Sequence, residues 1–392
     1  MRIYLDNSAT TKPYPEVVAA MQQVLQDNWG NPSGIHSFGR DAYDAMSAAR
    51  RQVAALLGAE PDEIYFTSGG TEADNLAILG VAGRFQRGHI ITSSIEHAAV
   101  LNCCRYLEGQ GFEVTYLPPD EDGLISPAQV EQALRPDTLL VSLMLANNEI
   151  GSLQPVAELG RLLAGRGVLL HTDAVQAVGK APVQVAELGV DMLTLSAHKI
   201  NGPKGCGALY VRHQTDLQPV LWGGGQERSL RSGTENLPGI VGLGVAAELT
   251  AQRWPQQARR AAAARDCFWH ELSRQLPGVV VNGGWERRLP GNLNLSFEGL
   301  ESAALLLFLD MAGVAVSAAS ACSSGRAEPS HVLQALGLPE WRLKSAVRLS
   351  FGWENTLMEA RQAAAIVAEQ VRLLRQETAA EQLDESFSQP GD

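Results

Sequence analysis

The chain has 392 residues, a formal net charge of −12 at pH 7 and 45% hydrophobic residues. This length exceeds what one hydrophobic core usually covers, so we expect one large and one small domain. The acidic balance, with no basic stripe, excludes a protein that binds nucleic acid through its phosphates and favours small-molecule chemistry. We find no signal-peptide pattern and no apolar run long enough to span a membrane. The five cysteines form neither a disulfide framework nor a metal-binding spacing, so we expect a cytoplasmic protein without a metal site.

Short β-rich runs alternate with amphipathic helical patterns over the N-terminal part of the chain. The strand-like runs cover 63–68, 89–94, 112–118, 138–145, 168–174, 191–197 and 207–212. Several are apolar throughout, which is typical of strands buried on both faces of a mostly parallel sheet. Helical patterns occupy 71–81, 98–110, 127–134 and 156–165. This alternation predicts a large, doubly wound α/β domain.

The C-terminal part has a different pattern, which predicts a smaller α+β domain. An alanine-rich helical stretch at 238–276 leads out of the large domain. Beyond it, strand-like runs at 278–283, 291–299, 313–320 and 346–351 alternate with helices at 302–311 and 355–376. We therefore predict a large domain over 14–255 and a small domain formed by 1–13 together with 256–376. The polar, acidic stretch 377–392 is expected to be a disordered tail.

Polar residues follow the predicted strands beyond their carboxyl ends, where ligands bind in open α/β sheets. Gly69 and Gly70 allow a tight turn before a helix that begins near Thr71, and the backbone amides there could bind a phosphate. The same residue types are also common helix caps. His97 begins the next helix, where it could contact a ligand, cap the helix or face solvent. Asn148, after the 138–145 strand, can present an amide to the same cleft.

A strand-end acid and a strand-end lysine complete this group. Asp173 ends an apolar strand, where a buried acid is rare unless it is paired, and Gln176 lies three residues further on. Ser196, His198 and Lys199 stand where another apolar strand stops and a glycine-rich turn begins. Desolvation at such a position frees a lysine amine for Schiff-base formation. A phosphate cradle, an acid and a lysine together predict a site for pyridoxal 5'-phosphate.

Cys322 is surrounded by small and polar residues in the stretch SAASACSSGRAEPS (317–330). Its serines, glycine and proline predict a surface loop rather than a packed element. The stretch alone leaves two interpretations open, a tolerated surface cysteine or a nucleophilic thiol.

A series of motifs occurs in order along the chain: YLDNSATT (4–11), TSGGTEADN (67–75), NNEIG (147–151), HTDAVQ (171–176), SAHKINGPKGCGALY (196–210), GGGQERSLRSGTEN (223–236), SACSSG (320–325) and VRLSFG (347–352). Together they resemble the cysteine desulfurases of the NifS/IscS type, within the class V aminotransferase family. The resemblance runs from about residue 3 to about residue 375. It implies the aspartate aminotransferase-like fold, fold type I of the pyridoxal phosphate enzymes.

The resemblance also implies a role for each cofactor-binding residue. Lys199 would bear the cofactor, Asp173 would pair with its ring nitrogen and Gln176 would approach its phenolic oxygen. His97 would stack on the ring as a third catalytic residue beside Lys199 and Cys322. Gly70 would approach the cofactor through its backbone. The phosphate would be held by Thr71, Ser196, His198 and, from the other subunit of a homodimer, Thr234.

For the substrate, the resemblance implies binding by Asn148 and Arg348, with Arg348 taking the α-carboxylate. Cys322 would accept the sulfur, so that L-cysteine gives L-alanine and a persulfide for transfer to iron–sulfur assembly proteins or other sulfur carriers. A cystine or selenocysteine lyase of the same fold remains an alternative, but it would need no acceptor thiol. A non-catalytic sulfur-relay scaffold is a second alternative, against which the presence of Lys199 and Asp173 argues.

Overall fold

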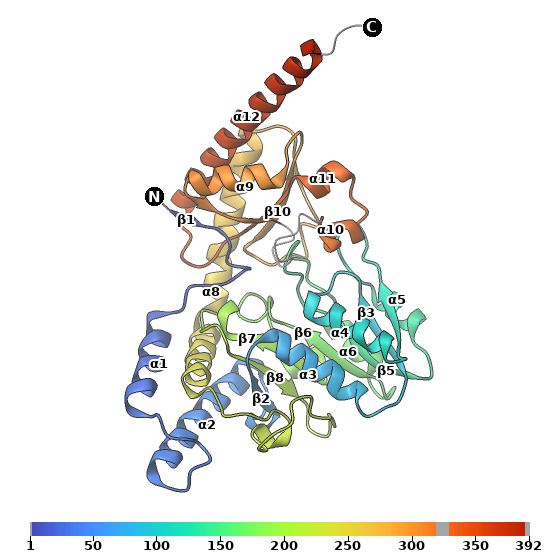
Figure 1. The fold of residues 1–392 in the computed structure, drawn as a ribbon, viewed down its shortest axis with the longest axis vertical. Coiled ribbons are helices and arrows are strands. Elements are labelled where there is room, and N and C mark those ends of the chain that lie inside the picture. Colours follow the sequence, from blue (N-terminus) through green and yellow to red (C-terminus); the bar gives the residue numbers. More distant parts are fainter. Residues whose placement is uncertain (1, 319–328, 389–392) are drawn as a thin grey trace. The chain divides into compact units, whose positions relative to one another are not determined.

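The computed structural model describes residues 2–318 and 329–388, with side chains described as far as residue 377 (Figure 1). The chain forms two compact units. The larger consists of Thr10–Asn148 and Ser152–Pro255, and the smaller of Met1–Ala9, Glu149–Gly151 and Gln256–Asp392. Cys322 lies outside the described residues.

The larger unit is built on a seven-stranded sheet with the order β2-β8-β7-β6-β5-β3-β4. The strands are β2 (Ile64–Thr67), β3 (His89–Ser93), β4 (Glu113–Leu117), β5 (Thr138–Ser142), β6 (Leu169–Asp173), β7 (Met192–Ser196) and β8 (Gly207–Val211). Strands β3 to β7 pair in parallel, which confirms the predicted α/β fold with a mostly parallel sheet. Strand β8 is antiparallel to both of its neighbours. The connection from β7 to β8 is too short for a crossover helix, so the chain must return in the opposite direction.

Helices α3 (Gly70–Ala82) and α4 (Ala98–Gly109) pack side by side against one face of this sheet. Their apolar side chains form one core with Ile90, Leu140 and Leu209 of the strands. The other connecting helices are α5 (Pro127–Ala133), α6 (Val156–Leu163) and α7 (Val185–Leu188). The sequence patterns did not indicate α1 (Pro15–Asp27), in which the buried residues are Val17 and Val24, or α2 (Ser37–Leu57), whose buried face mixes glycine and alanine with larger apolar side chains.

The smaller unit contains a four-stranded antiparallel sheet with the order β12-β13-β10-β9. These strands are β9 (Val279–Val281), β10 (Asn292–Phe297), β12 (Ser317–Ala318) and β13 (Ala346–Ser350). A separate parallel pair joins β1 (Ile3–Tyr4) to β11 (Val314–Ala315). The helices are α9 (Ser302–Met311), α10 (His331–Ala335), α11 (Glu340–Lys344) and α12 (Leu357–Ser388). Helix α8 (Leu237–Gln275) begins in the larger unit and contains Pro255, the last residue of that unit.

Two features of the smaller unit differ from the sequence-based expectation. The short segment Glu149–Gly151 belongs to it because Asn292 and Asn294 donate side-chain hydrogen bonds to the Glu149 carbonyl at 3.1 and 3.3 Å. Helix α12 continues to Ser388, within the stretch expected to be disordered. Alanine, glutamate, glutamine and leucine in that stretch all have high helix propensity. Among the described residues, no helix is both long and apolar enough to cross a membrane.

Candidate cofactor and active site

The carboxyl ends of β2, β6 and β7 bring several of the predicted site residues close together within the larger unit. Asp173 ends β6 opposite Thr194 of β7, and Ser196 ends β7 opposite Gly207 of β8. Gly207 in turn faces the last residue of β2. At the start of α3, a Cβ added to Gly70 would lie 2.9 Å from a Val175 methyl group and 3.8 Å from the Ser196 Cβ. The helix start therefore abuts the segments that follow β6 and β7.

The start of α3 has the geometry of an anion site. Gly69 has φ of 157°, a conformation that side chains rarely allow, and it makes no side-chain cap to the helix. Because Gly69 provides no side-chain cap, the first-turn N–H groups of α3 can donate hydrogen bonds to a phosphate. A Cβ on Gly207 would lie 2.7 Å from the Gly69 Cα, so a glycine is needed for β8 to pass this turn. Thr71, the second helical residue, is exposed and can add its hydroxyl.

Asp173 and His97 lie together in the buried part of the site. Asp173 is 6% exposed, and its Oδ1 accepts a hydrogen bond from the Val175 amide at 2.9 Å. Burial raises the pKa of the Asp173 carboxyl, while His97, the Val175 amide and Lys199 favour its charged form. A carboxyl in this setting suits a cationic partner such as a protonated pyridine nitrogen. The His97 ring caps α4 by accepting a hydrogen bond from the Ala99 amide at 3.2 Å, which confirms the capping interpretation. A nitrogen of the same ring lies within 4.8 Å of an Asp173 carboxylate oxygen.

Ser196, His198 and Lys199 follow one another at the end of β7. Ser196 is 3% exposed, and a single 3-10 turn over Ala197–Lys199 carries the other two side chains. His198 is held by Thr10, whose hydroxyl lies 3.2 Å from Nδ1. Burial and the nearby Lys199, Lys204 and Lys180 lower the pKa of His198 to about 4, so its ring is neutral at neutral pH. A neutral imidazole can still donate one hydrogen bond to a phosphate oxygen.

Gln176 lies beyond Asp173 and is 4% exposed; its Oε1 accepts from Lys180 at 2.9 Å. Asn148 is half-buried in the loop after β5, and Thr234 is exposed in the segment before α8. Arg348 belongs to the smaller unit, where it is 2% exposed and donates to Asp6 at 2.9 Å. The assigned roles of these residues remain predictions.

Sequence reasoning missed two buried acids beside Asp173. Asp74 lies on α3 and is 1% exposed. A carboxylate oxygen of Asp74, a carboxylate oxygen of Asp173 and a ring nitrogen of His97 all lie within 4.8 Å of one another. Burial and the neighbouring Asp173 raise the pKa of Asp74 well above its ordinary range. Two carboxylates this close repel each other, which favours a proton on one of the pair. Glu96 is fully buried, accepts from the Met144 amide and has its pKa raised by burial to about 8.

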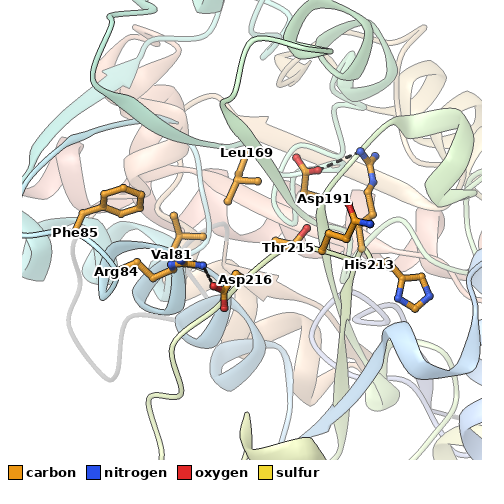
Figure 2. A pocket seen from close by; sticks show the side chains of 10 residues that line it. Val81, Arg84, Phe85, Leu169, Asp191, His213, Thr215 and Asp216 are labelled. Carbon is orange, nitrogen blue, oxygen red and sulfur yellow. Dashed lines mark ion pairs between the residues drawn. The ribbon is translucent and has the colours of Figure 1, made fainter.

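A pocket of about 290 Å³ lies elsewhere on the larger unit, at the amino end of β6 and β7 (Figure 2). Leu169 begins β6 and Asp191 directly precedes β7, so this pocket is at the opposite edge of the sheet from Asp173. Arg212 pairs with Asp191 at 3.1 Å, and Arg84 pairs with Asp216. Its main charged groups are thus already satisfied within the chain.

Comparison with known families shows to which family the chain belongs. The sequence profile of the family described as "Aminotransferase class-V" matches residues 3–362. The chain belongs to this family, and its fold is that of the family's pyridoxal phosphate enzymes, as predicted.

Its relatives define a narrower group. The chain is 48% identical over 375 residues to "Cysteine desulfurase IscS" of Methanosarcina thermophila, covering 95% of this chain and 93% of that protein. It is 48% identical over 356 residues to "Cysteine desulfurase IscS" of Dictyoglomus turgidum, covering 90% of both chains. Among solved structures, a "NifS-like protein" matches with a TM-score of 0.90 at 37% identity, covering 95% of this chain and 100% of that chain. "SspA in complex with cysteine" matches with a TM-score of 0.80 at 39% identity, covering 90% and 99%. The predicted resemblance to cysteine desulfurases is confirmed.

Proposed function

We propose that this chain is a pyridoxal phosphate-dependent cysteine desulfurase, which converts L-cysteine to L-alanine and leaves a persulfide on Cys322. The observation that carries the proposal is the convergence of the α3 start, Asp173 and Lys199 at one edge of the sheet. The cysteine desulfurases among its relatives, and a cysteine complex of a similar structure, support the choice of substrate.

The residues present fit pyridoxal 5'-phosphate in three respects. The phosphate would meet the α3 amides with Thr71, Ser196 and neutral His198. The ring nitrogen, when protonated, would supply a cationic partner to the buried Asp173, which accepts a hydrogen bond from the Val175 amide. The aldehyde would react with Lys199, whose charge already influences Asp173.

Each side chain then has a defined task during turnover. The bound cofactor supplies an electron sink that acidifies the Cα–H bond of the substrate. Lys199 would remove the Cα proton and, once the sulfur has left, return a proton to Cα. Asp173 would hold the ring nitrogen in its protonated form, and His97 would stack on the ring. Asn148 and Arg348 bind the substrate, the guanidinium of Arg348 engaging its carboxylate.

Cys322 completes the reaction by nucleophilic attack. Its thiolate forms a bond to the substrate sulfur as the Cβ–S bond breaks, and the electron pair of that bond passes to the substrate carbon. Protonation of this carbon gives alanine, so cysteine and one enzyme thiol yield alanine and one persulfide. We propose that protein acceptors, such as iron–sulfur assembly proteins, then take this sulfur. The cytoplasm is the compartment in which the acceptor thiol stays reduced.

We further propose that the active form is a homodimer in which Thr234 reaches the phosphate site of its partner. Large apolar side chains are exposed on the larger unit, including Trp29 (69%), Ile35 (94%), Phe38 (51%) and Trp222 (78%). Clusters of such side chains mark surfaces that bind other proteins. Sedimentation of the purified protein tests the dimer, and Thr234→Ala should weaken cofactor binding without changing the sedimentation coefficient.

The activity is tested by anaerobic turnover of L-cysteine with a thiol reductant, with alanine and sulfide counted separately. Cys322→Ala should abolish alanine formation while the protein still binds the cofactor. Cys267→Ala is the matched control, because Cys267 is the partly exposed cysteine among the described ones and belongs to helix α8. Full activity of Cys322→Ala would refute the desulfurase mechanism and favour the lyase alternative.

A further inference from the structure

A chain of buried hydrogen bonds runs across the sheet below the site. The Ser142 hydroxyl on β5 lies 2.9 Å from Nδ1 of His171 on β6, and Nε2 of His171 lies 3.0 Å from the Thr194 hydroxyl on β7. All three residues are wholly buried. The next group in the chain is Asp74 on α3, to which the Thr194 hydroxyl donates. The proposed reaction assigns none of these four residues a task.

The direction of the donors in this chain follows from its members. Burial lowers the pKa of His171 to about 3, so the ring is neutral and has one N–H donor. Because Thr194 donates to Asp74, it accepts from the His171 Nε2–H, and Nδ1 then accepts from Ser142. Every donor thus points toward Asp74, which is the end of the chain.

The surroundings of Asp74 favour the protonated form of its carboxyl. Its Oδ1 is buried and has no hydrogen-bond partner among the described residues. The ionisable groups that face this part of the site are Asp173 and His171 from β6, His97 and Cys103 from α4, Glu96 just before α4, and Lys199 after β7. Asp173 must be ionised to pair with a protonated ring, and a second carboxylate within 4.8 Å would oppose that state.

We propose that Asp74 is a positioning residue for the contact between Asp173 and the ring nitrogen of the cofactor. Its carboxyl is protonated on Oδ1 and accepts a hydrogen bond from Thr194. In this state Asp74 keeps water away from Asp173 and adds no second negative charge beside it. Asp74 acts only through Asp173 and touches no reacting atom. The proposal rests on the proposed use of pyridoxal phosphate.

The test is a pH titration of the ring nitrogen. The full-length protein is loaded with pyridoxal 5'-phosphate that is isotopically labelled at this nitrogen, and NMR follows loss of its proton as the pH rises. Asp74→Asn is a neutral, nearly isosteric replacement, whereas Asp74→Ala removes the polar group and admits water to Asp173. Asp191→Asn is the matched control, since Asp191 is a partly buried acid at the opposite end of β7 whose pKa is also raised by burial.

We expect Asp74→Asn and Asp191→Asn to leave the titration midpoint within about half a pH unit of the wild type. Asp74→Ala should lower it by about one unit or more and weaken cofactor affinity about tenfold. If Asp74→Ala does not fold, Thr194→Val removes the hydroxyl that holds Asp74 and should act in the same direction.

Two results would overturn the role of Asp74. If Asp74→Asn lowered the midpoint of the ring-nitrogen titration by more than about one pH unit, Asp74 would carry a negative charge in the wild type. An unchanged midpoint and affinity in Asp74→Ala would mean that it does not position Asp173. A wild-type protein that binds no pyridoxal phosphate would overturn both this inference and the proposed function.

Discussion

The buried Glu96 offers a stability measurement whose size follows from the structure. Burial raises its pKa from the ordinary 4.5 to about 8, although Ser93 and the Met144 amide donate hydrogen bonds to its carboxyl. Between these two values the unfolded chain loses the proton and the folded protein keeps it. The folded state is therefore penalised increasingly as the pH rises from about 4.5 to about 8. Below this window Glu96 is neutral in both states and carries no such penalty.

Replacing Glu96 with glutamine removes this penalty, since the amide stays neutral at every pH. At 1.36 kcal/mol per pKa unit, the expected gain in unfolding free energy is roughly 1 kcal/mol at pH 5 and about 4 kcal/mol at pH 8. Urea denaturation of the cofactor-loaded wild type and Glu96→Gln at both pH values measures the difference. Glu113→Gln is the control, because Arg135 lowers the pKa of this surface glutamate and no gain at pH 8 is expected. An equal effect of Glu96→Gln at pH 5 and pH 8 would show that Glu96 does not keep its proton in the folded protein over this pH range.

Two further predictions concern cofactor and substrate binding. Gly207→Ala should weaken pyridoxal phosphate binding about tenfold or more, as measured by absorbance titration. The new Cβ would lie 2.7 Å from the Gly69 Cα and would displace the turn before α3 that is expected to bind the phosphate. Gly109→Ala is the control: its Cβ would meet nothing within 4 Å, so this variant should bind the cofactor normally. Arg348→Lys should raise the KM for cysteine about tenfold or more with a smaller effect on kcat, since lysine cannot make a bidentate carboxylate contact; an unchanged KM in steady-state assays would remove Arg348 from the substrate site.

The alternation of apolar strand runs with helical patterns was enough to predict the larger unit, because strands buried on both faces have an unmistakable composition. The same reasoning placed Asp173 and Ser196 correctly, since polar residues that end apolar strands lie at the ligand-binding edge of such a sheet. Lys199 and Gly70 followed because each is adjacent in sequence to such a strand end.

Other features depend on contacts that sequence patterns do not display. The transfer of Glu149–Gly151 to the smaller unit depends on two asparagine side chains more than a hundred residues away. Asp74 lies on an apolar helix face with Ala73 and Leu76. An acidic residue on such a face is unusual, and this was the sequence signal that could have identified Asp74 as a site residue. Its proximity to Asp173 could be recognised only once the register of β6 and β7 was known, which sets Thr194, the hydrogen-bond donor to Asp74, opposite Asp173.

Sulfur transfer from cysteine to Cys322 can be observed in a single anaerobic turnover. The cofactor-loaded protein is mixed with one equivalent of L-cysteine labelled with a heavy sulfur isotope, alkylated and digested for mass spectrometry. We expect one labelled persulfide on the Cys322 peptide and one equivalent of alanine, with the Cys267 peptide unlabelled. Alanine formed while all the labelled sulfur appears as free sulfide, with no persulfide on Cys322 at any time, would contradict sulfur transfer to Cys322.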